Sequence, residues 1–113
     1  MKLALPLLLL GLAAFANTAP AVADDNAGSA AIASLGQIHG IALACQQPAI
    51  VSRARNAVQT TAPKTRANGE TFEQATNDAF LAQGGAECPD VATLNARLGE
   101  AEQQLQKAYS SAQ

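Results

Sequence analysis

The sequence contains few of the side chains from which most metal and cofactor sites are built. It holds a single histidine, His39, two cysteines, Cys45 and Cys88, and one methionine, Met1. The spacings CxxC, CxxCH and HxxxH are all missing, which argues against the usual zinc sites and covalently attached haem. Gly84-Gly85 lacks the lysine and the serine or threonine of a phosphate-binding loop. We therefore expect no metal and no cofactor.

The same scarcity argues against catalysis. A cysteine nucleophile needs a histidine base within hydrogen-bond reach. His39 precedes Cys45 by six residues on a predicted helix, so the two side chains point about 120° apart. Glu100 and Glu102 form a close pair of carboxylates, but glutamines follow them on what we expect to be an exposed helix face. We predict no catalytic residues and expect that the protein is not an enzyme.

Charged residues are also scarce, at 14% of the chain, and the net charge at pH 7 is −2. Partners of nucleic acids need a clustered positive surface, so we expect no nucleic-acid binding. Between Gln46 and Asn68 the sequence carries basic residues without acidic ones, namely Arg53, Arg55, Lys64 and Arg66, and acidic residues follow. We interpret this pattern as solvated helix faces of complementary charge.

The amino terminus has the pattern of a secretory signal peptide. Lys2 supplies a positive charge, Leu3–Phe15 an apolar stretch, and Ala21-Val22-Ala23 a cleavage site between small residues. The apolar stretch is shorter than the roughly 20 residues that span a membrane, so we expect no stable membrane insertion after cleavage. The sequence thus predicts a signal peptide over residues 1–23, a domain over residues 24–113, and a periplasmic or secreted protein.

Apolar residues recur at helical spacing in four segments, and no β-type alternation of useful length is present. The first segment, around Ile32–Cys45, has little polar surface and predicts a central, buried helix. The second segment opens at Pro48 and ends at Ala62-Pro63-Lys64. The third begins with Asn68 as N-cap and ends with a left-handed cap at Gly84-Gly85. The fourth has Pro89 and Asp90 in its first turn and runs through Ala108.

Short connections favour antiparallel neighbours, so the sequence predicts an all-α fold, a small up-down four-helix bundle. In that arrangement the end of the first helix and the start of the fourth lie at the same pole, and Cys45 and Cys88 fall there. In an exported protein two cysteines usually pair, and a disulfide would stabilise a domain whose core is small. We predict a Cys45–Cys88 disulfide, with an intermolecular bridge or metal binding as the alternatives.

Small residues line one side of the first helix. Gly36 and Gly40, with Ala33 and Ala44, recur every three or four residues, which would let a neighbouring backbone approach closely. Close packing within the bundle is one interpretation, and a self-association face is the other.

His39 lies between Leu35, Ala42 and Leu43 on the same helix. The simpler interpretation is a partly buried structural histidine. The alternative is a pH sensor, because an imidazole titrates near neutrality and a buried one destabilises the fold when it becomes charged.

The stretch Thr60–Gly69 is the longest predicted loop, and it carries Lys64 and Arg66 opposite the disulfide pole. Loops often hold binding residues, so these two are candidates for contact with an anionic partner surface. A loop that only connects two helices is the alternative.

Because we expect no catalysis, no metal or cofactor and no nucleic-acid binding, the functions that remain are the binding of a protein or of a small ligand. We expect first an exported interaction or accessory protein with an unidentified protein partner, either monomeric or weakly homo-oligomeric. The layout of a short exported helical chain with two widely spaced cysteines resembles that of HdeA-type acid-stress chaperones of the bacterial periplasm. This resemblance implies the alternative of a chaperone that exposes helix faces when it partly unfolds. A small-ligand-binding helical protein is the second alternative.

Overall fold

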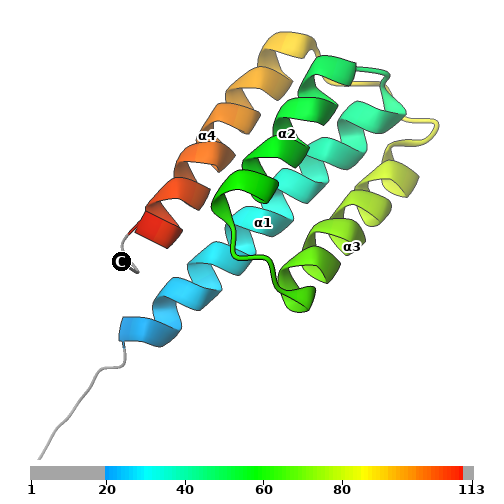
Figure 1. The fold of residues 1–113 in the computed structure, drawn as a ribbon. Coiled ribbons are helices and arrows are strands. Elements are labelled where there is room, and N and C mark those ends of the chain that lie inside the picture. The colour runs from blue at the N-terminus through cyan, green and yellow to red at the C-terminus, as the bar shows by residue number, and fades with distance from the viewer. Residues whose placement is uncertain (1–19, 111–113) are drawn as a thin grey trace, which may run out of the picture.

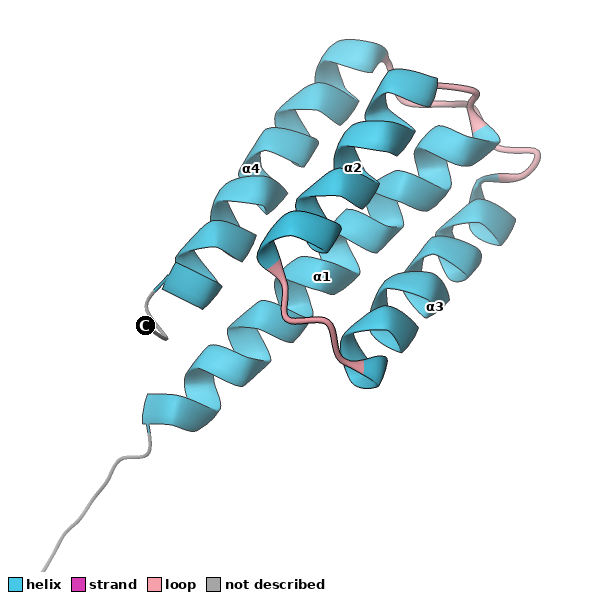
Figure 2. Ribbon diagram, in the orientation of Figure 1, coloured by secondary structure: helices cyan, strands magenta, loops and turns pink. Residues whose placement is uncertain are grey.

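The computed structural model describes the backbone of residues 20–110 and the side chains of residues 26–110. This part of the chain forms four helices and no strand (Figures 1 and 2), which are α1 (Pro20–Ala44), α2 (Pro48–Thr61), α3 (Arg66–Gln83) and α4 (Val91–Ser110). The expected all-α fold is confirmed. Residues 1–19 of the predicted signal peptide lie outside the described residues, so cleavage after Ala23 and the domain boundary stay predictions.

Successive helices run antiparallel, as predicted, and α1 lies at the centre (Figure 1). Within residues 20–110, α1 contacts the other three helices and α2 contacts α4, whereas α3 contacts α1 alone. The largest fully buried side chains come from α1 and α4 and are Ile32, Leu35, Leu94, Leu98 and Leu105. The core therefore lies between α1, α2 and α4, and α3 is docked against the outside of this three-helix unit.

The composition of α1 follows from its central position. Asn26–Ala44 has the length and the mean hydropathy, 1.2, of a membrane-crossing helix, and half of it is buried inside the bundle. A helix that packs against neighbours on several sides needs apolar residues on several sides. The other three helices are amphipathic: α2 buries Ile50 and Ala54, while α3 buries only Ala79.

Local hydrogen bonds set the helix ends, and the predicted starts of α3 and α4 are both wrong by a few residues. The N-cap of α3 is Thr65, whose side chain accepts a hydrogen bond from the Asn68 backbone N–H at 3.1 Å, so Asn68 lies inside the helix. Asp90 is likewise the N-cap of α4 and not part of its first turn, since its carboxylate accepts from the Thr93 backbone N–H at 2.7 Å, which lowers the Asp90 pKa. The left-handed position after α3 is Gly85, with φ of 86°.

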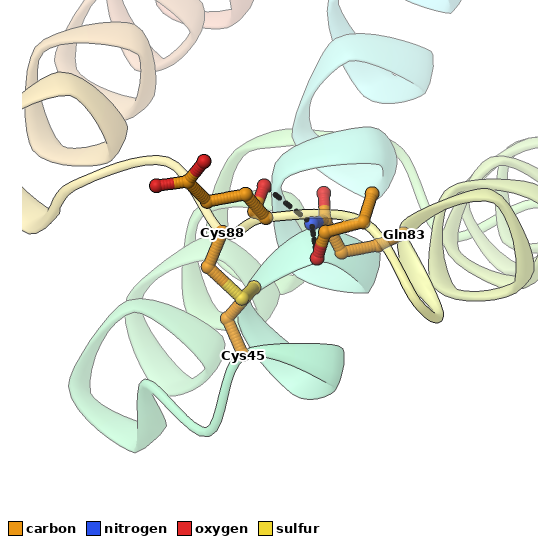
Figure 3. The surroundings of a disulfide bond; sticks show 5 residues. Cys45, Gln83 and Cys88 are labelled. Carbon is orange, nitrogen blue, oxygen red and sulfur yellow. Dashed lines mark hydrogen bonds between the residues drawn. A yellow bond between two sulfur atoms is a disulfide. The ribbon is translucent and has the colours of Figure 1, made fainter.

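The predicted disulfide is confirmed. Cys45 and Cys88 are joined with an S–S distance of 2.01 Å and a Cα–Cα distance of 5.9 Å, which links the end of α1 to the connection between α3 and α4 (Figure 3). The Gln83 side-chain amide donates to the backbone carbonyls of Ala86 and Glu87 at 3.2 and 3.0 Å, and so orders the turn that leads to Cys88. The end of α3 is thereby held close to the end of α1.

An ion pair joins α2 to α4 on the other side of the molecule. Arg53 donates from Nε and Nη2 to the two carboxylate oxygens of Glu102 at 2.9 and 2.8 Å. Half of the Arg53 side chain is exposed, so the pair contributes about 1 kcal/mol or less. No ion pair between side chains of residues 26–110 joins α3 to another helix.

Candidate functional site

Gly36 and Gly40 form the seat of α3. A Cβ atom on Gly36 would lie 2.7 Å from the Phe72 carbonyl oxygen, and one on Gly40 would lie 2.9 Å from the Phe80 nitrogen and against the Thr76 carbonyl. These are backbone atoms of α3, so the small residues allow the two helices to approach closely. The interpretation of close packing within the bundle is confirmed. Both glycines are buried under α3, so self-association through them would require α3 to move, and that alternative stays a prediction.

The loop assigned to Thr60–Gly69 is much shorter than predicted. It consists of residues 62–65, because α2 continues to Thr61 and α3 already begins at Arg66. Lys64 donates to the backbone carbonyl of Gln59 at 2.8 Å, and Arg66 pairs with Glu70 at 3.2 Å on the surface of α3. Lys64 and Arg66 thus lie opposite the disulfide, as expected, but Lys64 caps the end of α2 and Arg66 pairs within α3.

His39 is buried where α1 meets α3, as the simpler interpretation expected. Its side chain is 6% exposed, its Nδ1 atom lies 3.1 Å from the Thr76 hydroxyl oxygen, and its ring centroid lies 4.8 Å from that of Phe72. The Nε2 atom is buried and has no hydrogen-bond partner among the described residues. Burial lowers the pKa of His39 below 6.5, and the positive charge of Arg55 on α2 lowers it further.

A groove opens next to His39, along the line where α3 packs on α1. It has a volume of about 800 Å³, and its lining comes from two residues of α1 and seven of α3, namely His39, Leu43, Glu70, Phe72, Glu73, Gln74, Thr76, Asn77 and Phe80. The Leu43 side chain is 40% exposed and that of Phe80 is 44% exposed. The groove therefore offers an apolar surface to a binding partner.

The polarity of the groove changes along its length. Leu43 and Phe80 lie at the end nearer the disulfide, close to the last residues of α1 and α3. Glu70 and Glu73 lie at the other end, in the first half of α3. Glu73 forms no salt bridge with any residue in the described part of the chain.

The periodicity of the sequence did not reveal this groove. Phe72 and Phe80 recur at helical spacing with Ala75 and Ala79, so the pattern alone does not say whether the aromatic or the small residues meet α1. The structure packs α3 on α1 through its small residues, Ala75 and Ala79, against the glycine seat. Phe72 and Phe80 consequently line the groove beside this contact, and Phe80 and Leu43 stay partly exposed.

The groove contains groups suited to binding. Its apolar side chains can bury a partner's apolar surface, its carboxylates can attract a cation, and its amides can donate or accept hydrogen bonds. No group of three His, Cys, Asp or Glu side chains in the described residues is placed to hold a metal ion, and both cysteines are in the disulfide. Compared with protein-family models, curated proteins and solved structures, the chain matches none of them.

Proposed function

We propose that this protein is an exported, non-enzymatic interaction protein that binds a protein partner through the groove formed by α1 and α3. The observation that supports the proposal is the partial exposure of Leu43 and Phe80 within one concave surface. Large apolar side chains that line a concave surface bury more area against a partner than isolated exposed ones such as Leu81. The partner's own apolar side chains supply the binding free energy by covering this surface.

Export is supported by two independent features. A disulfide is stable in an oxidising compartment and is rare in the cytosol. Residues 1–23 have the sequence of a cleavable leader. We expect the protein recovered from the cell envelope or the medium to have a mass that corresponds to a first residue of Asp24. A full-length mass in the soluble cytosolic fraction would contradict export.

A photo-crosslinking amino acid at position 80 tests the proposed docking surface. We expect it to capture a discrete protein adduct in the native envelope, because Phe80 lies in the groove. The same amino acid at position 103, an exposed glutamine on α4, is the matched control and should give no such adduct. Equal capture from both positions, or none from position 80, would contradict the proposal.

The alternative of a chaperone that opens at low pH has one observation in its favour. Helix α3 packs on a single helix and covers a buried histidine, so its release would expose apolar surface of α1 and α3. An acid titration with an aggregating client protein distinguishes the two functions. A chaperone suppresses aggregation only after partial unfolding, whereas an interaction protein binds its partner in the folded state.

A further inference from the structure

The surface of the groove has a shape that fits an α-helix. Its lining residues form rows spaced four residues apart, such as His39 and Leu43 on α1 and Phe72, Thr76 and Phe80 on α3. Rows of this spacing are the ridges of a helix surface, and the channels between them accept the ridges of another helix. The stretch from Glu70 to Phe80 is about 15 Å long, which matches roughly three helical turns.

The charges within the groove differ from those on the neighbouring helix α2, none of whose residues lines the groove. On the α3 wall, Glu73 has no salt-bridge partner in the described residues, and Glu70 pairs only with the highly exposed Arg66. On the α2 side, Arg55 is exposed and close enough to His39 to lower its pKa. A partner that carries a cation toward α3 is attracted, whereas one that carries a cation toward α2 is repelled.

We infer that the partner segment is an amphipathic helix with a large apolar side chain and, two turns away along the flank facing α3, a lysine or arginine. The apolar side chain lies between Leu43 and Phe80, and the cation lies beside Glu73. Seven residues separate Glu73 from Phe80, which corresponds to about 10 Å along the helix axis. This inference rests on the proposed function and adds the chemistry of the partner.

Two synthetic peptides of roughly 18 residues, long enough to be helical, provide the probes. Both consist of alanine and glutamine with one leucine, and they carry either lysine or glutamate two turns from it. Fluorescence anisotropy measures their binding to the purified, oxidised protein. We expect the lysine peptide to bind about three- to tenfold more tightly than the glutamate peptide at low salt.

Substitutions in the protein identify the site. Glu73→Lys should reverse the preference between the two peptides, and Phe80→Gln should abolish binding of both. Asp78→Lys makes the same change in net charge on α3 but lies outside the groove, and Leu81→Gln removes an exposed apolar side chain outside it. Both of these controls should leave the preference intact.

Several outcomes would overturn the inference. They are equal binding of the two peptides, absence of binding to either, and an effect of Asp78→Lys as large as that of Glu73→Lys. A homodimer in sedimentation experiments that Phe80→Gln dissociates would identify a second copy as the occupant. A crosslinked partner without such a helix refutes only this inference, whereas absence of any adduct at position 80 refutes the proposed function.

Discussion

Among the described side chains, His39 is the single buried polar or charged one, and its burial should make the fold sensitive to pH. The unfolded chain titrates this histidine near 6.5, and burial followed by the charge of Arg55 lowers its pKa in the folded state. Above that pH both states are neutral at His39. As the pH falls below it, the unfolded state binds a proton first, so the fold loses stability until the folded pKa is reached.

We therefore predict that His39→Gln flattens the dependence of unfolding free energy on pH between pH 7 and 5. Glutamine can keep a hydrogen bond to Thr76 but does not titrate. The slope that it removes is at most about 1.4 kcal/mol per pH unit. Urea denaturation followed by circular dichroism at several pH values measures it. Arg55→Gln is the companion variant: it should raise the folded-state pKa of His39, which NMR titration detects, so that the loss of stability ends at a higher pH and is smaller. An unchanged slope in His39→Gln would refute this role.

Two glycines in helix interiors should respond to the same substitution with opposite signs. Gly40→Ala places a methyl group 2.9 Å from the Ala79 Cβ atom and the Phe80 nitrogen, so α3 has to move away. We expect a loss of about 1–3 kcal/mol in stability. Gly99→Ala meets no atom within 4 Å in α4 and should gain about 0.5–1 kcal/mol from helix propensity. Thermal denaturation of the two variants measures both effects. A loss of stability in both variants would show that the lack of space around Gly40 does not explain the loss in Gly40→Ala.

At the scale of the helices, α3 stands out because it packs on one neighbour only within residues 20–110. Within the described part of the chain it contacts α1 alone, and it buries one residue, Ala79. Elements with few buried apolar contacts open at lower free energy than the rest of a domain. We predict that the backbone amides of α3 exchange with deuterium faster than those of α1 and α4, as mass spectrometry would measure. Equal protection of all four helices would show that the glycine seat holds α3 as tightly as the core.

The disulfide should add to the packing that holds α3 on its single neighbour, α1. Cys45 and Cys88 close a loop with a sequence separation of 43, so the Cys45→Ser/Cys88→Ser variant should lose about 4 kcal/mol on the chain-entropy account. Denaturant titration gives this loss, and hydrogen exchange shows where it occurs. We expect the additional exchange to concentrate in α3, whose end is tied to α1 through Cys88. A variant as stable as the parent would mean that packing alone fixes α3.

For the whole molecule, the sequence predicted the order and direction of the helices but not how they surround the core. Helical spacing identifies which face of a segment is apolar, and the position of the two cysteines independently supports the antiparallel order. Periodicity does not say which neighbour a face meets. The choice between the aromatic row of α3 and its row of small residues was decided by the space over Gly36 and Gly40, which only three-dimensional packing reveals.

The misplaced loop residues have a similar origin. Thr65 and Asn68 are both good N-cap residues, so the sequence alone did not select between them. In the structure the Thr65 side chain accepts the hydrogen bond from the Asn68 backbone N–H, which makes Thr65 the N-cap. With α3 starting at Arg66, the loop shrinks to residues 62–65, and the exposed side chains of Lys64 and Arg66 both make contacts within the chain, while their role in binding a partner stays a prediction. The groove residues were missed because they looked like core residues.

The central position of α1 also bears on how the protein can diverge in evolution. A helix enclosed by three others accepts few exchanges, since each side chain has to fit several neighbours at once. The outward faces of α2, α3 and α4 are far less restricted. Descendants of this gene should retain the Gly36 and Gly40 spacing, the apolar residues around it and the two cysteines long after the remaining helices have drifted, so that common ancestry stays visible over α1 alone.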